Sequence, residues 1–278
     1  MSEITEIIDH TGQVRHMGLN PVSDRNLMMR ASRQAFKAHL ESIGRGLIPR
    51  SKWVPIDRRK VLDTKFINDQ KSSSGCTGWS AVQGLMRLRA LQGMEFKKLS
   101  GAFIYALING GRDQGSVIVD ALEILETVGT CLESEMNFPN IYERDISPIA
   151  REDAKRFRLM RGLTCDTFDE ACTAIQLGFI VQFPIMVGQK FETFSDGIAG
   201  FTNGYGNHSV HADGMTMVNG KWVLDMPNSW GVNWGPFKNG RCYIEERAFA
   251  GQGGMDDSYI HVDATFDPQD PNLPGPPA

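Results

Sequence analysis

The sequence predicts an α+β protein in which a helical half precedes an antiparallel β half. Apolar residues recur at helical spacing after Cys76 and again in the segment Asp120 to Gly129. From Phe179 onward the period changes to the alternation of a strand, and Asn219-Gly220 between two apolar runs is typical of a type I′ hairpin turn. We expect a site that draws residues from both halves to lie in the cleft between them.

The bulk composition is that of a globular protein with a large core. Of the 278 residues, 41% are hydrophobic and 22% charged, and the formal net charge is −4. The sequence pI of about 5.9 indicates no basic face for nucleic acid or for an anionic membrane. No apolar run approaches the ~20 residues of a membrane helix, and Met1 to Gly18 lacks the apolar core of a secretory signal. We therefore expect a protein that is not exported, located in the cytoplasm or carried within an assembly.

The cysteines indicate neither a disulfide framework nor a zinc site. Their number is odd and they show no C-x-x-C spacing: Cys76, Cys131, Cys165, Cys172 and Cys242. We expect no metal and no cofactor.

Residues 1–46 form a separate N-terminal segment. Ser23 or Asp24 can cap a helix that runs to about Ile43, with an apolar stripe made of Leu27, Ala31, Phe36, Leu40 and Ile43. The segment is either a short inhibitory pro-segment or an arm that docks onto the main body or onto a partner, and we favour the arm. Leu47 to Asp69 is polar and rich in turn residues, so we expect it to wrap the body as an extended chain.

The remaining elements follow from periodicity. The expected helices are a helix from Cys76 that ends at Gly93, then Leu99–Ile108, Val117–Val128 and Phe168–Leu177. The expected strands are a half-buried Phe179–Val187, a hairpin of Val210–Val218 with Lys221–Met226, and Arg241–Glu245 as the last strand. A long glycine-rich loop, 197–207, precedes the hairpin. Thr265 to Ala278 is rich in proline and polar residues and is expected to be an extended or disordered tether.

One cysteine stands in a position suited to nucleophilic chemistry. Gln70 begins the stretch Q-K-S-S-S-G-C, which places Cys76 after a loop of small residues and at the start of a helix. The positive end of a helix favours a thiolate over a thiol, and the thiolate is the nucleophile. A buried structural cysteine is the alternative.

Two distant segments complete a family pattern. Gly206 to Met215 reads G-N-H-S-V-H-A-D-G-M, and Asn228 to Gly235 reads N-S-W-G-V-N-W-G. With a glutamine six residues before the cysteine, a histidine 132 residues after it and an asparagine 20 residues further on, the chain resembles the papain-like cysteine proteases (peptidase C1 type). The resemblance covers roughly Ile48 to Phe249.

The resemblance implies a role for each residue of the pattern. Cys76 would be the nucleophile, His208 would carry the proton, and Asn228 would orient the imidazole ring. The Gln70 amide and the backbone N–H of Cys76 would form the oxyanion hole. Trp230 would cover the contact between Asn228 and His208, although core packing also explains a tryptophan there.

The resemblance also implies substrate-binding positions and shows departures. Gly115 and Ser116 stand where the family keeps a glycine pair that binds substrate backbone, and Asn207 precedes the histidine. Lys71 and Thr77 replace a usual glycine and tryptophan beside the cleft. The disulfide that braces this loop in secreted relatives is replaced by Ser73 and, approximately, Asp113, which suits a reducing compartment.

His211 competes with His208 on hairpin geometry. Ideal pairing about Asn219-Gly220 places Asn228 opposite His211 and His208 opposite Gly231. The family pattern favours His208, which requires a bulge or an early end of the ladder at Pro227. We expect Asp213 to be a structural carboxylate.

These observations predict a cysteine endopeptidase that acts on a peptide or protein through a thioester, without nucleic acid or membrane. The alternative is a papain-like structural or binding module of a larger assembly, such as a particle component. A third interpretation is a related amide chemistry, such as cell-wall peptide hydrolysis or transamidation.

The expected domains are an N-terminal arm or pro-segment (1–46), a catalytic domain (47–250) and a C-terminal extension with a Pro-rich tail (251–278). Within the catalytic domain, we expect a helical lobe at about 70–160 and a β lobe at about 161–250. Arm and tail are candidates for docking onto a partner or onto the body.

Overall fold

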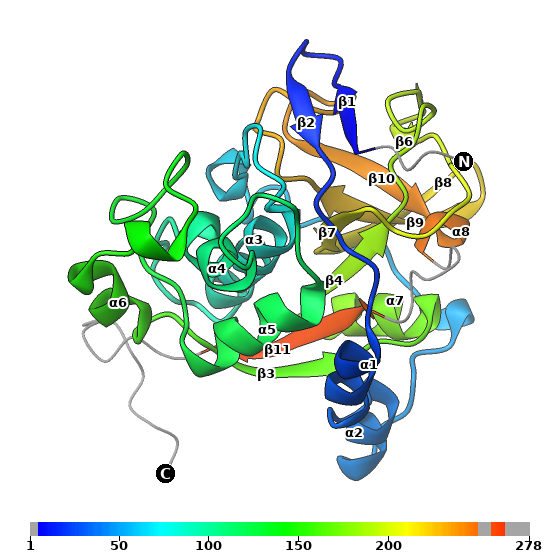
Figure 1. The fold of residues 1–278 in the computed structure, drawn as a ribbon. Coiled ribbons are helices and arrows are strands. Elements are labelled where there is room, and N and C mark those ends of the chain that lie inside the picture. Colours follow the sequence, from blue (N-terminus) through cyan, green and yellow to red (C-terminus); the bar gives the residue numbers. More distant parts are fainter. Residues whose placement is uncertain (1–4, 250–256, 265–278) are drawn as a thin grey trace.

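The computed structural model describes residues 5–249 and 257–264. The helices of residues 76–154 gather on one side of the molecule, and most strands lie on the other side together with the remaining helices (Figure 1). The helices are α1 (Asp24–Ala31), α2 (Phe36–Ser42), α3 (Cys76–Leu91), α4 (Gly101–Ile108), α5 (Ile118–Thr127), α6 (Pro148–Ala154), α7 (Phe168–Gln176) and α8 (Glu246–Phe249). Three 3₁₀ turns, η1 (Arg50–Lys52), η2 (Thr64–Phe66) and η3 (Glu143–Asp145), lie between them.

Within the described residues, the strands form three sheets. A small hairpin joins β1 (Glu6–Ile8) and β2 (Val14–His16). One sheet has the order β5-β6-β10-β9-β8, and the other has the order β3-β11-β4-β7. Their strands are β3 (Leu159–Thr164), β4 (Ile180–Ile185), β5 (Phe194–Ser195), β6 (Ile198–Ala199), β7 (His208–Ala212), β8 (Gly214–Val218), β9 (Lys221–Pro227), β10 (Arg241–Glu245) and β11 (Tyr259–Ala264). This mixture of helices and mostly antiparallel strands confirms the predicted α+β class.

Helix α3 is the centre of the molecule. Residues Cys76 to Arg89 are all buried, because α4 and α5 pack on one side of the helix and β7, β4 and β11 on the other. Glycines permit these close approaches: a Cβ added at Gly78 would lie 2.7 Å from the Gly101 oxygen, and one at Gly84 would lie 2.9 Å from the His261 ring. The prediction of a helix beginning at Cys76 is confirmed.

The hairpin turn is confirmed, but the strand that precedes it is not continuous. Asn219 and Gly220 both have positive φ, 51° and 74°, as a type I′ turn requires. The ladder runs from Val218 opposite Lys221 to Gly214 opposite Asp225 and then ends. At Asp213 the chain crosses into the other sheet, where β7 pairs with β4.

Strand β4 is buried on both faces. The prediction of a half-buried strand is wrong, since every residue from Ile180 to Ile185 is buried. Helices α3, α7 and α8 pack against this strand. Its one polar residue is Gln182, whose side-chain nitrogen donates to Ser80 Oγ (2.8 Å) and Ser209 Oγ (3.2 Å). This buried nitrogen is therefore satisfied by hydrogen bonds.

A further strand follows Glu245. The prediction that Arg241–Glu245 is the last strand is wrong, because β11 lies between β3 and β4 in the four-stranded sheet. Residues 257–264 are therefore part of the packed body, although we placed the C-terminal extension at 251–278. The expected tether, Thr265 to Ala278, lies outside the described residues.

The N-terminal segment contains two helices where one was expected. Ser23 caps α1 as predicted, through a capping box with Asn26. The helix ends at Ala31, and Thr164 N–H then donates to the Gln34 carbonyl (3.1 Å), which draws this part of the chain alongside β3. The expected apolar stripe holds only in part, since Leu27 and Ile43 are 42% and 53% exposed whereas Phe36 and Leu40 are buried.

Residues 47–69 wrap the body with little regular structure, as predicted. Isolated bridges join Ile56 to Met215 and Asp69 to Trp230. The second bridge delivers Gln70 to the neighbourhood of the N-S-W-G segment.

Candidate active site

Cys76 is the first residue of α3 and is completely buried. Backbone groups of Ser209 and Gly18 lie close enough to its sulfur to lower the pKa of the thiol, as do those of Thr77 and Cys76 itself. Ser209 directly follows His208 on β7. The thiol therefore lies where the helical half meets the β half, with residues from the N-terminal segment above it.

His208 and Asn228 form a pair. His208 Nε2 and Asn228 Oδ1 are 2.9 Å apart, and both residues are fully buried. The Trp230 ring lies against the imidazole, with ring centroids 4.9 Å apart. Among the described residues, His208 Nδ1 has no hydrogen-bond partner. This ring nitrogen therefore makes no hydrogen bond to the Cys76 sulfur, while the other is fixed by the amide.

Gln70 is held between the loop before Cys76 and the N-terminal segment. Its Nε2 donates to the carbonyls of Ser73 (2.9 Å) and His16 (3.3 Å), and its Oε1 accepts from Ser229 Oγ (2.7 Å). The amide proposed for an oxyanion hole thus already holds a carbonyl oxygen, that of His16.

The predicted substrate-binding residues hold the protein's own chain. We call residues 16–20 the strap. Its backbone makes three further hydrogen bonds: Ser116 N–H donates to the Gly18 carbonyl (2.8 Å), Asn20 N–H to the Ser116 carbonyl (2.9 Å), and Leu19 N–H to the Asn207 carbonyl (3.0 Å). Ser116 precedes α5 and Asn207 precedes β7, so the strap crosses from one half of the molecule to the other. Figure 1 shows this blue segment running from β2 down to α1.

Gly18 is the tightest point of the strap. A Cβ added there would lie 1.6 Å from the Ser74 carbonyl oxygen, and one added at Gly115 would lie 2.3 Å from the Gly18 oxygen. Because backbone atoms cannot yield as a flexible side chain can, only glycine fits at position 18 in this conformation.

A buried arginine anchors the start of the strap. Arg15 binds Asp9 Oδ2 (2.7 Å), Asp69 Oδ1 (2.6 Å) and the Trp230 carbonyl (2.6 Å). Asp69 precedes Gln70, and Trp230 covers His208. The anchor therefore links the β1–β2 hairpin directly to the walls of the candidate site.

Burial favours the neutral forms of the Cys76 thiol and the His208 imidazole. It raises the pKa of Cys76 to about 11 and lowers the pKa of His208 to about 4, although the bond to Asn228 opposes the second shift. The expectation that the helix end favours a thiolate is not met here, because the loss of hydration under the strap outweighs the helix dipole.

His211 belongs to a different environment. It lies opposite Gln182 in the β4–β7 ladder, and neither of its ring nitrogens has a partner among the described residues. Because β7 leaves the hairpin at Asp213, the competing pairing of His211 with Asn228 does not form. Pro227 does not end the ladder as we considered, since it continues β9 opposite Arg241.

Asp213 is a structural carboxylate, as expected. It accepts from Arg87 Nη1 (2.5 Å) and forms an ion pair with Arg241, which also binds Asp225 (2.8 Å). All four groups are buried. Despite its burial, the two guanidinium groups lower the pKa of Asp213.

A hydrogen-bonded carboxylate braces the loop before Cys76. Asp113 Oδ1 accepts from Ser74 N–H (2.8 Å) and from the Tyr105 hydroxyl (2.7 Å). All five cysteines are free. Asp113 therefore ties the same two segments that we expected a disulfide to join in relatives.

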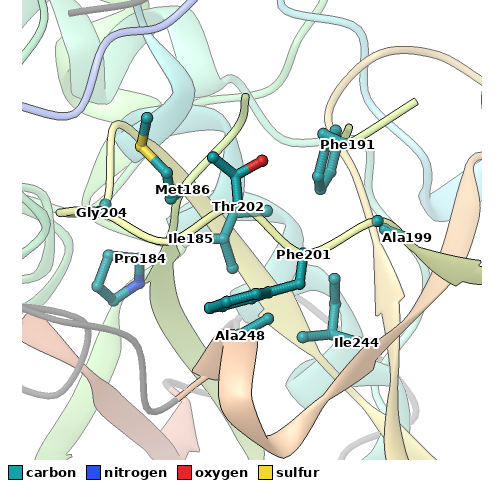
Figure 2. A pocket seen from close by; sticks show the side chains of 12 residues that line it. Pro184, Ile185, Met186, Phe191, Ala199, Phe201, Thr202, Gly204, Ile244 and Ala248 are labelled. Atoms are coloured by element: carbon teal, nitrogen blue, oxygen red, sulfur yellow. The ribbon is translucent and has the colours of Figure 1, made fainter. Parts of the chain in front are cut away.

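An apolar pocket supports the loop before β7. It lies between the end of β4 and residues 199–206, and its walls include Ile185, Phe201 and Ile244 (Figure 2). This packing fixes the loop that ends in Asn207, whose side chain also pairs with the Val187 backbone.

The strap was not found by sequence reasoning. The segment H-M-G-L-N carries no periodicity, and its one signal is a glycine, which fits many loops. Within residues 5–249 and 257–264, no cluster of three or more histidine, cysteine or acidic side chains is placed to hold a metal ion. No helix in the same part of the chain has the length and apolarity needed to cross a membrane.

Comparison with known proteins gives a match in structure alone. No family model and no curated protein sequence matches the chain. Xylellain, a cysteine protease from Xylella fastidiosa, superposes with a TM-score of 0.67 and 18% identity, covering 87% of this chain and 94% of its own. Procathepsin L 3 from Tenebrio molitor gives 0.59 and 17%, covering 86% and 79%. Bromelain from Ananas comosus gives 0.58 and 16%, covering 79% and 100%. The protein has the papain-like fold.

Proposed function

We propose that the protein is a cysteine endopeptidase whose cleft is closed by its own N-terminal strap. The observation that carries this proposal is the pairing of His208 with Asn228, directly before Ser209, whose backbone acts on the thiol of a cysteine at a helix N-terminus. A strap held by backbone hydrogen bonds across the same cleft is how an extended peptide would bind there.

The chemistry divides among the residues of the site. The Cys76 sulfur attacks the carbonyl carbon of the scissile amide, and the carbonyl oxygen becomes negative. Gln70 Nε2 and the Cys76 N–H stabilise that oxygen. His208, oriented by Asn228, takes the thiol proton and gives it to the departing amine. Water then hydrolyses the thioester, and His208 accepts a proton from that water.

Release of the strap is the step that permits this chemistry. While the strap is bound, burial raises the pKa of Cys76 to about 11 and His16 occupies the Gln70 amide. Removing the strap hydrates the thiol, lowers its pKa, and frees the backbone groups of Ser116 and Asn207 for a peptide. Because the neighbour from Tenebrio molitor is a procathepsin, an inhibitory role for the segment gains weight over a plain docking arm.

A single substitution in the full-length chain tests both statements. Gly18→Ala adds a methyl group that the Ser74 carbonyl excludes, so the strap cannot lie in the cleft. We expect Gly18→Ala to raise Cys76 labelling by a thiol-reactive peptidyl probe, and cleavage of a peptide library, at least tenfold over wild type. Gly46→Ala is the matched control, since an added Cβ there meets no atom within 4 Å.

The mechanism is tested in the opened chain. His208→Ala in the Gly18→Ala background should prevent both labelling and cleavage. A chain that opens, exposes Cys76 to a small alkylating reagent, and still cleaves no peptide would contradict the peptidase proposal and favour a papain-like binding module.

A further inference from the structure

The β1–β2 hairpin is attached to the body through buried charged groups. Arg15 is 1% exposed and Asp9 is 3% exposed, and the two form an ion pair inside the hairpin (2.7 Å). Arg15 also reaches the body, where Nη1 donates to Asp69 Oδ1 and Nη2 to the Trp230 carbonyl, each at 2.6 Å. Because loss of Arg15 would leave these acceptors without a donor, the attachment is costly to break.

Both acceptors of Arg15 in the body lie next to residues of the candidate site. Asp69 directly precedes Gln70, and the Trp230 ring lies against the His208 ring. Asp69 and Trp230 also pair with each other in an isolated β-bridge. Arg15 therefore joins the segment that carries the Gln70 amide to the segment that covers the imidazole.

The backbone after Gln70 depends on the same carboxylate. Lys71 has a φ of 55°, a left-handed conformation that is unfavourable for a residue with a side chain. Its backbone N–H donates to Asp69 Oδ1 and its Nζ to Asp69 Oδ2, both at 2.9 Å. Asp69 Oδ1 thus accepts from Lys71 and from Arg15 together. By fixing this carboxylate, Arg15 supports the chain on both sides of Gln70.

A second contact of the hairpin reaches the other tryptophan of the N-S-W-G-V-N-W-G segment. His10 lies at the turn of the hairpin, and its backbone N–H donates to Glu192 Oε2 (3.2 Å) while its Nδ1 lies 2.7 Å from the same oxygen. Glu192 Oε1 accepts from Trp234 Nε1 (3.0 Å), and the Trp234 ring packs edge-on against Trp230 with centroids 5.3 Å apart. The hairpin therefore supports the wall of the site at two separate points.

The strap is attached in a different way. It is held by backbone hydrogen bonds to Ser116 and Asn207, and no side chain of residues 16–20 forms an ion pair with any described residue. A peptide bound along the same edges would replace these backbone bonds one for one. It has nothing with which to replace the guanidinium of Arg15. The strap is thus exchangeable with a substrate, whereas the hairpin is not.

We propose that the β1–β2 hairpin is a permanent part of the active site, that Arg15 is a positioning residue for Gln70 and Trp230, and that only the strap leaves. The inference rests on the proposed peptidase function. It assigns opposite effects to two residues of one segment: Gly18 lets the cleft close, whereas Arg15 shapes the cleft once it is open. Removal of the whole N-terminal segment would therefore impair the enzyme.

The first experiment measures peptide cleavage by full-length chains that carry Gly18→Ala, normalised to the folded fraction by circular dichroism. Adding Arg15→Ala should reduce kcat about tenfold or more, because the oxyanion donor is no longer held in place. KM should change less than about threefold, since Arg15 touches no substrate. Arg15→Lys keeps the charge but not the fork of donors, so it should lose less than Arg15→Ala. Guanidinium chloride, far below the concentrations that unfold the chain, should restore part of the lost kcat, with sodium chloride as the salt control.

Arg25→Ala in the same Gly18→Ala background is the matched control. It removes an exposed cation of α1 in the same N-terminal segment and should leave kcat and KM unchanged. An unchanged or higher kcat in Arg15→Ala would show that the hairpin only anchors the strap. That result would overturn the inference while the peptidase proposal stands.

The second experiment needs no catalysis, so failure of the proposed function does not affect it. Hydrogen exchange followed by mass spectrometry compares full-length wild type with Gly18→Ala in peptides covering residues 5–15, 16–22 and 66–74. We expect exchange in 16–22 to accelerate at least tenfold in Gly18→Ala, while exchange in 5–15 changes less than twofold. With Arg15→Ala added, exchange in 66–74 should also accelerate, because the loop around Gln70 loses its support.

Two results of the exchange measurement would refute a permanent hairpin. One is joint acceleration of 5–15 and 16–22 in Gly18→Ala, which would show that hairpin and strap leave together. The other is unchanged exchange in 66–74 when Arg15→Ala is added, which would show that Arg15 does not support the loop around Gln70.

Discussion

The two ends of strand β7 hold similar residues in different surroundings. At one end, His208 pairs with Asn228 and directly precedes Ser209, whose backbone acts on the Cys76 thiol, and the neighbouring Asn207 binds a strap that is held by backbone hydrogen bonds. At the other end, His211 lies near Arg87, Asp213 and Arg241, which are buried and fixed by one another. Both imidazoles are fully buried and both have a lowered pKa. The difference is that the first end is covered by a strap, which we propose can leave and admit water, whereas the second end is covered by the packed body.

Substitutions at the two ends of β7 should differ most in their effect on peptide turnover. We expect His208→Ala in the Gly18→Ala chain to reduce kcat/KM by about 10³-fold or more, because the proton carrier is lost. His211→Ala should leave most of the activity per folded molecule, because its ring forms no hydrogen bond to Asn228 or to the strap. Peptide hydrolysis, normalised to the folded fraction by circular dichroism, is the measurement. The reverse ranking would assign the proton transfer to His211.

The sealed end should dominate stability. Asp213→Asn removes the carboxylate between two buried guanidinium groups, and we expect it to reduce the free energy of unfolding by about 3–5 kcal/mol. Asp57→Asn, which breaks an exposed pair with Arg59, should cost less than about 1 kcal/mol. Denaturation in urea measures both. If Asp213→Asn and Asp57→Asn reduced the free energy of unfolding equally, the buried network at the end of β7 would stabilise the protein no more than an exposed ion pair does.

The anchor of the strap should control access to the cleft. Arg15→Ala leaves Asp9 buried without its partner, so we expect Cys76 alkylation in the full-length chain to accelerate at least tenfold. Arg25, 68% exposed at its side chain and bound to Asp120 (3.2 Å) in the same N-terminal segment, is the matched control. Arg25→Ala should change the rate less than twofold. An unchanged rate in Arg15→Ala would show that the backbone bonds alone hold the strap.

The smallest effect is that of pH on strap opening. With the strap bound, the pKa of His208 is lowered from 6.5 to about 4, so the open state binds more protons between these values. The closed state therefore loses stability as the pH falls from about 6.5 to about 4, and we expect opening to rise about tenfold between pH 7 and pH 5. The alkylation rate of wild type divided by that of Gly18→Ala isolates opening from thiol reactivity.

Cys76 adds a second limb to this pH dependence. Its pKa is raised from 9.0 to about 11 in the closed state, so the closed state also loses stability as the pH rises from about 9 to about 11. His208→Gln should remove the acidic limb and keep the alkaline one. An acidic limb that persists in that variant between pH 6.5 and pH 4 would show that His208 is not its source.

Local patterns predicted those parts of the molecule that local physics controls. The type I′ turn at Asn219-Gly220 formed because both residues tolerate positive φ. Helix α3 began at Cys76 and ended two residues before Gly93. The partnership of His208 with Asn228 followed from a family pattern, whereas hairpin geometry alone favoured His211. That geometry failed because Asp213 pairs with arginines distant in sequence, at the point where the chain changes sheets.

The amino-acid sequence by itself determined the main helices that follow Cys76, the hairpin register, and the chemical types of the residues proposed for the site. Tertiary structure alone decided that β11 enters the four-stranded sheet, that residues 16–20 fill the cleft, and that burial keeps the Cys76 thiol protonated. The physical reason is range: turns and helix ends depend on neighbouring residues, while desolvation depends on whichever distant segment covers a group. The residues next to Gly18 in the sequence do not indicate its role in the strap. Only its close approach to the Ser74 carbonyl requires a glycine at this position.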